Sequence, residues 1–117
     1  MADVLGRGAA VLKLECFQHT GTFKARGALS VARSLHTEQL ARGVTAASAA
    51  NHAIAAAWAA RQVGASAKVV IRANANPFRI AMAKAQGAEV IMKAPGAQTY
   101  LRLMVRGMPA FEALVKS

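Results

Sequence analysis

The sequence predicts an α/β fold of three layers, in which a parallel sheet is covered by helices on both faces. Three short runs with β-branched residues, at 44–47, 67–71 and 88–92, alternate with segments of helical length. Strands that alternate with helices imply right-handed βαβ crossovers, which make the strands parallel and place helices on both faces of the sheet.

The N-terminal part of the chain is predicted to form a strand and then a helix. Residues 10–14, AVLKL, have the composition of a short strand bounded by small residues. Residues 23–35 are predicted to form the first helix. One face of that helix would carry apolar side chains for the core, namely Ala28, Val31, Ala32 and Leu35.

The next two helices have clearer boundaries. Residues 53–63 are rich in alanine, and Gly64 would end this helix in the conformation that glycine favours. Asn76 can cap the third helix, Pro77 suits its first turn, and Gly87 would terminate it. The pattern then weakens, and residues 98–105 and 109–116 could each form a helix.

Composition favours one small domain of modest stability. The chain has 117 residues, of which 55% are hydrophobic, but much of that share is alanine, which buries little area per residue. The net charge of +10 allows nucleic acid, membrane surfaces or small anions as partners. The basic residues are scattered without long runs or interleaved aromatics, which argues against nucleic acid.

Neither a disulfide nor a membrane span is predicted. Cys16 is the single cysteine, and the first eight residues lack the apolar core of a secretion signal, so the cytosol fits best. Residues 44–60 are uncharged, but they include several polar side chains and much alanine, which is only weakly lipophilic. No Cys/His set has the spacing of metal ligands, so no metal site is predicted.

Three segments resemble one enzyme family. Residues 12–28, LKLECFQHTGTFKARGA, closely resemble the lysine motif of fold-type II pyridoxal-phosphate (PLP) enzymes. Residues 48–53, SAANHA, resemble their Ser-x-Gly-Asn-His-type loop, and residues 68–92 fit their next unit. The chain is therefore similar to the N-terminal part of the threonine dehydratase and serine racemase family, which is related to the tryptophan synthase β chain.

The resemblance implies a domain organisation and an assembly. Residues 1–97 would correspond to the small lobe of these enzymes, and residues 98–117 would form a divergent helical tail. The glycine-rich loop that holds the cofactor phosphate in the family has no counterpart in this sequence, so the second lobe is expected to be missing. A homo-oligomer is the expected assembly.

Lys24 is the candidate catalytic residue. The resemblance implies that its amine attaches PLP and that Phe23 lies beside the cofactor. A lysine must lose its proton to attack an aldehyde, and the first turn of a helix disfavours the charged form of the amine. A positive side chain in the first turn opposes the helix dipole, and such local conflicts are more common at functional sites. The alternative is an exposed lysine tolerated at a helix start.

The loop of residues 48–52 is the candidate substrate site. Because it joins a predicted strand to a helix, its backbone N–H groups and the helix dipole can bind a carboxylate. The resemblance implies that Ser48, Ala49, Ala50, Asn51 and His52 bind the substrate, and that Asn51 also hydrogen-bonds the phenolic oxygen of the pyridoxal ring. Asn51 could instead only cap the helix, and His52 could be a packed or surface histidine. Trp58 and Phe23 are most simply core residues.

One residue departs from the family pattern within this loop. Ala50 stands where the family has glycine, and its Cβ can obstruct a positive φ or the close approach of a carboxylate.

The function that the resemblance implies is a PLP-dependent lyase. It would dehydrate and deaminate L-threonine or L-serine, both hydroxyamino acids, to a 2-oxo acid and ammonia. Lys24 would remove the Cα proton, and the cofactor ring would accept the electrons. Three alternatives remain open: an amino-acid racemase that returns the proton to Cα, an inactive lobe that self-associates, and a basic nucleic-acid binder.

Overall fold

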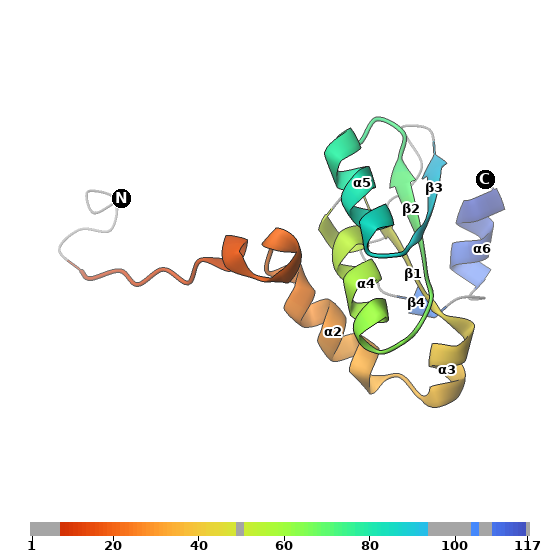
Figure 1. The fold of residues 1–117 in the computed structure, drawn as a ribbon, viewed down its shortest axis with the longest axis horizontal. Helices are drawn as coiled ribbons and strands as arrows, with labels where there is room; N and C mark the ends of the chain where they lie inside the picture. The colour runs from red at the N-terminus through yellow and green to blue at the C-terminus, as the bar shows by residue number, and fades with distance from the viewer. Residues whose placement is uncertain (1–7, 49–50, 94–103, 106–108, 117) are drawn as a thin grey trace.

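The computed structural model describes residues 8–48, 51–93, 104–105 and 109–116. Their centre is a four-stranded sheet with the order β3-β2-β1-β4 (Figure 1). The strands β1 (Val44–Ser48), β2 (Ala67–Arg72) and β3 (Glu89–Lys93) are parallel. The short β4 (Met104–Val105) pairs antiparallel with β1. The predicted α/β fold with a parallel sheet is confirmed.

The register of the parallel strands brings their carboxyl ends to one edge. Val44 pairs with Ala67 and Ser48 with Ile71, so β1 and β2 end almost level. Before β1, Gly43 has φ +87°, and a Cβ on it would lie 2.3 Å from the Ser66 Oγ. Only glycine fits there without strain, because the backbone is left-handed and the neighbouring loop is already in contact.

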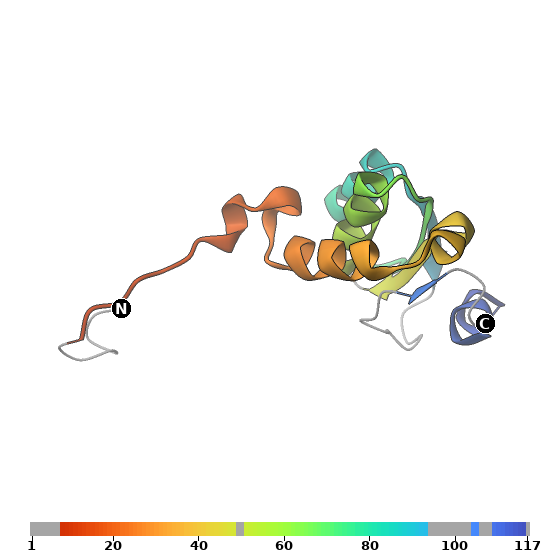
Figure 2. The same cartoon turned by 90° about the horizontal axis from the view of Figure 1, so that it is seen from below.

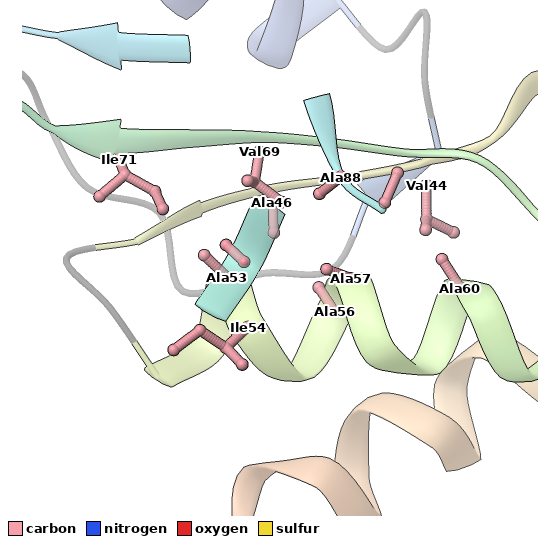
Figure 3. Close-up of a cluster of buried hydrophobic side chains, with 12 residues drawn as sticks. Val44, Ala46, Ala53, Ile54, Ala56, Ala57, Ala60, Val69, Ile71 and Ala88 are labelled. Atoms are coloured by element: carbon pink, nitrogen blue, oxygen red, sulfur yellow. The ribbon is translucent and has the colours of Figure 1, made fainter. Parts of the chain in front are cut away.

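One face of the sheet packs against helices. Val44 and Ala46 of β1 and Val69 and Ile71 of β2 contact the alanine-rich side of α4 (Asn51–Gln62), as Figure 3 shows. Helix α5 (Pro77–Ala85) packs beside α4 and against β3, and α2 (Lys24–Ser34) packs on the other side of α4. The core therefore depends on a few Ile and Val side chains among many alanines.

The opposite face is covered by α6 (Pro109–Lys116), which was predicted as a helix. Val115 packs against Ala47, Val70 and Ile91, the strand residues that alternate with those facing α4. Figure 2 shows α6 on the opposite side of the sheet from α4 and α5. The sheet is thus covered on both faces, as the sequence predicts.

The helix boundaries agree closely with the sequence signals. The Asn76 Oδ1 accepts a hydrogen bond of 2.9 Å from the Phe78 N–H, and Pro77 opens α5. Gly64 and Gly87 have φ of +72° and +86° after α4 and α5. These caps confirm the predicted ends, because positive φ at the residue after a helix is inexpensive only for glycine.

The predicted strand at residues 10–14 is wrong. These residues have no regular structure and form an arm that projects from the body (Figure 1). Val11 is 96% exposed, because no strand in the described part of the chain lies beside the arm to complete a ladder. Two short 3₁₀ turns, η1 (Glu15–Phe17) and η2 (His19–Gly21), connect the arm to α2.

Two further expectations need correction, and one helix was not predicted. Val31 lies on the exposed side of α2, whereas Ala28 and Ala32 are buried. Residues 104–105 form β4 rather than the end of a helix, and residues 98–103 lie outside the described residues. The short helix α3 (Thr37–Arg42) was not predicted. Within the described residues, no helix is both long enough and apolar enough to cross a membrane.

Candidate functional site

The candidate site lies at the edge of the sheet where β1 and β2 end. Ser48 is the last residue of β1, α4 begins at Asn51, and α5 begins at Pro77 after β2. The carboxyl edge of parallel strands is where open α/β sheets bind ligands. The first turns of the following helices also present unpaired N–H groups there.

Two parallel helices bring Lys24 and Asn51 to this same end. Helices α2 and α4 run in the same direction (Figure 1) and meet through alanines, with Ala28 and Ala32 on α2 and Ala55 and Ala59 on α4. Lys24 lies four residues before Ala28, and Asn51 lies four residues before Ala55, so each is about one turn N-terminal of this contact. The lysine and the amide predicted as site residues therefore belong to one end of the helix pair.

Lys24 is half-buried and is the first residue of α2. Its Nζ lies 6.0 Å from the centre of the Phe23 ring, at the outer limit of a cation–π contact. Phe23 itself is 62% exposed, so the expectation that it is a core residue is wrong. Its ring can still form one wall beside the lysine.

The segment before Lys24 is attached to the body by two contacts. The His19 ring stacks on the half-buried Trp58 of α4, with 4.9 Å between ring centres and 15° between planes. Glu15 accepts a hydrogen bond of 2.9 Å from Arg26 of α2 and forms an ion pair of 3.1 Å with Lys13. Hydrogen bonding to Lys13 and then to Arg26 lowers the pKa of Glu15. These contacts place the loop against both helices.

Two threonines in this loop have hydroxyls that lack a partner. The Oγ1 atoms of Thr20 and Thr22 are buried and make no hydrogen bond among the described residues. Thr20 also has φ +66°, which is uncommon for a residue other than glycine. Buried hydroxyls without partners cost free energy, and strained backbone is concentrated at ligand sites.

These donors allow a test of whether the residues fit PLP. The cofactor needs an amine for its aldehyde and hydrogen-bond donors for its oxygens. Lys24 offers the amine, Asn51 offers an amide, and the hydroxyls of Thr20 and Thr22 lie four and two residues before the lysine. The residues present fit the reactive part of the group.

The remaining residues of the predicted substrate loop are placed only in part. Ser48 is buried at the end of β1, and His52 is half-buried in the first turn of α4. Ala49 and Ala50 lie outside the described residues, so the effect of alanine in place of glycine stays a prediction. Asn51 is half-buried at the first position of α4.

Sequence reasoning missed one residue of this edge. The Arg79 Nη1 donates a hydrogen bond to the Asn51 Oδ1, which joins the first turn of α5 to the first turn of α4. A signal for Arg79 was available in the sequence. Like Lys24, it is a cation in the first turn of a predicted helix, where the dipole opposes positive charge.

A surface pocket elsewhere does not belong to this site. It is lined by residues of α3 and its N-terminal flank, namely His36, Thr37, Glu38, Gln39 and Arg42. Helix α3 follows the far end of the 11-residue α2, which is about 16 Å long. The described residues contain no group of three or more His, Cys, Asp or Glu side chains that could hold a metal ion.

Comparisons with known proteins identify relatives of this chain. A phenylserine dehydratase from Ralstonia pickettii is 49% identical over 90 residues, which are 76% of this chain and 28% of the relative. A catabolic L-threonine dehydratase from Staphylococcus aureus is 39% identical over 93 residues, 80% of this chain and 27% of the relative. Maize serine racemase matches with a TM-score of 0.69 and 38% identity, over 73% of this chain and 26% of the racemase.

The chain thus spans a little over a quarter of the length of these relatives. The model of the pyridoxal-phosphate dependent enzyme family matches residues 1–108, which include Lys24, Asn51 and Arg79. The chain belongs to the pyridoxal-phosphate dependent enzyme family.

Proposed function

We propose that this chain carries the lysine-bearing part of a PLP-dependent ammonia-lyase site that acts on hydroxyamino acids. One observation carries the proposal. The contact between α2 and α4 places Lys24 and Asn51 at the same end of two parallel helices, beside the carboxyl edge of the sheet. An amine, an amide donor and free helix N-termini at one edge match the needs of an anionic aldehyde cofactor and an amino-acid carboxylate.

Each residue has a distinct role in this proposal. PLP, when bound, supplies an electron sink that acidifies the Cα–H bond of an amino acid. The Lys24 amine holds the cofactor and afterwards accepts the Cα proton. The first turn of α4, with Ser48 before it and His52 within it, binds the substrate carboxylate through N–H groups. Asn51 donates to the phenolic oxygen of the cofactor, and Phe23 shields one side of Lys24 from water.

The substrate class follows from the relatives. Two of the relatives are named for phenylserine and threonine, and both amino acids carry a hydroxyl on Cβ. Removal of the Cα proton and loss of that hydroxyl as water leave an enamine, which a water molecule hydrolyses to a 2-oxo acid and ammonia. Return of the proton to Cα gives racemisation, the reaction for which the maize relative is named. We favour elimination because the two dehydratases named above have the higher sequence identities.

The test is chemical trapping of the cofactor on the intact chain. Mixing with PLP, reduction with borohydride and peptide mass analysis should place the adduct on Lys24. Lys24→Ala should lose the adduct, whereas the matched control Lys84→Ala, at an exposed lysine in the last turn of α5, should keep it. An adduct on another lysine, or equal labelling of the Lys24→Ala variant, would contradict the proposal.

A second candidate function rests on the arm and the adjoining turn η1. Val11, Leu12, Leu14 and Phe17 are all exposed, and such a group of apolar side chains is unusual on a monomer. An inactive lobe could use the arm to self-associate. Sedimentation that shows a single monomeric species over a wide range of concentration would exclude this alternative.

A further inference from the structure

We infer that Arg79 is a positioning residue, which holds the Asn51 amide so that its N–H donors face the ligand. This inference rests on the proposed function, because the ligand in question is the phenolic oxygen of PLP. The observation is the hydrogen bond from the Arg79 Nη1 to the Asn51 Oδ1, between the first turns of α5 and α4.

The orientation of the amide follows from the chemistry of arginine. A guanidinium has five N–H donors and no acceptor, so it can pair only with the carbonyl oxygen of an amide. The Asn51 Oδ1 must therefore face Arg79. The Nδ2 of the same amide, with its two N–H donors, must then point away from Arg79. Without this contact the amide could turn its oxygen toward the ligand and repel a phenolate.

The support for Arg79 is itself rigid. The first turn of α5 is fixed by the hydrogen bond that the Phe78 N–H donates to the Asn76 Oδ1. The ring of Pro77 also restricts the backbone there. The Arg79 N–H also donates to the Asn76 carbonyl oxygen at 2.9 Å. The side chain is half-buried, so less of its charge is screened by water than on an open surface.

The charge adds a second effect. Arg79 draws electron density from the Asn51 carbonyl, which makes the amide N–H groups better donors. The first turns of α4 and α5 meet at this contact, so two positive helix ends add to the arginine. Together they favour an anionic oxygen over a neutral one as the partner of Asn51.

The first experiment reads the amide without any ligand. The Asn51 side-chain N–H signals are identified in nitrogen-15 NMR spectra by their loss in Asn51→Asp. Arg79→Met keeps the length of the side chain but removes its donors, and should move these signals. Arg79→Lys should restore them in part. Arg61→Met, at an exposed arginine near the other end of α4, should leave them unchanged.

The second experiment uses pyridoxine phosphate, which keeps the phenolic oxygen but has no aldehyde for Lys24. Arg79→Met should weaken its binding about tenfold, the loss of roughly one charge-assisted hydrogen bond. The Asn51 signals should respond to the probe in the natural chain and not in this variant. Arg61→Met should bind the probe as the natural chain does.

The outcomes distinguish the positioning role of Arg79 from the proposed attachment of PLP to Lys24. Unchanged Asn51 signals in Arg79→Met, or equal binding of pyridoxine phosphate, would overturn the role of Arg79 even if borohydride still traps PLP on Lys24. Trapping that fails on Lys24, while the Asn51 signals still depend on Arg79 and respond to the probe, would overturn the proposed reaction and leave the orientation of the amide in place.

Discussion

The two sides of the candidate site are held in different ways. Ser48 ends β1 and Asn51 begins α4, and both elements are packed in the core. Ile54 of α4 is only 1% exposed, and the neighbouring alanines are buried. Lys24 follows a loop that is joined to the body by one ring stack and one ion-pair group, with an apolar arm before it. An apolar sequence alone does not ensure burial, because it also needs a surface to cover it.

The largest effect is expected in the sheet body. Ile54→Ala should lower the free energy of unfolding by about 2–4 kcal/mol, because it removes a fully buried side chain from a core with few large residues. Urea denaturation measures this loss. The matched control, Val31→Ala on the exposed side of α2, should cost much less. Equal losses would show that burial in the sheet body does not decide how much a side chain contributes to stability.

A smaller and more local effect is expected for the ring stack. His19→Ala should leave the unfolding of the sheet nearly unchanged but open the segment before Lys24, with a local cost of about 0.5–1.5 kcal/mol. Hydrogen exchange should speed up at residues 18–24 and not in β1 or β2. His19→Phe keeps a flat ring against Trp58 and should preserve protection. Faster exchange throughout the chain in His19→Ala would show that the two regions unfold together.

The smallest effect concerns pH. Hydrogen bonds from Lys13 and Arg26 lower the pKa of Glu15 below its ordinary value of 4.5 in the folded chain. The contact therefore stabilises the segment above that ordinary value, and the stabilisation is lost as the pH falls through the lowered pKa. An NMR titration of the Glu15 carboxyl carbon should give a midpoint below 4.5, which rises in Lys13→Gln. A midpoint at or above 4.5 in the natural chain would show that the loop is not attached in this way.

Much of the fold could be predicted because its signals are local. Asn76, Pro77 and Gly87 each act on the backbone within a few residues, so the limits of α5 were accessible from the sequence. The strands β1, β2 and β3 are short runs bounded by turn residues. The predicted strand at residues 10–14 failed for the opposite reason, since a strand depends on a partner that may be distant in sequence.

In the candidate site, too, local motifs could be predicted from the sequence and tertiary contacts could not. Lys24 and Asn51 were predicted because each stands in a recognisable motif, yet their common position depends on how α2 packs on α4. Arg79 lies 28 residues from Asn51, and only the meeting of two helix ends brings them together. The exposure of Phe23 could not be predicted either, because it depends on which surfaces the described chain supplies to cover the ring.

The alanines between α2 and α4 act as a spacer that sets where the amine stands relative to the amide. Methyl groups let the two backbones approach closely, and a side chain even two carbons larger at Ala28 or Ala55 would push the helices apart. Such a change would lie a full turn away from either reactive group and would still move one relative to the other. The reach of the lysine is therefore governed in part by residues that have no chemistry of their own.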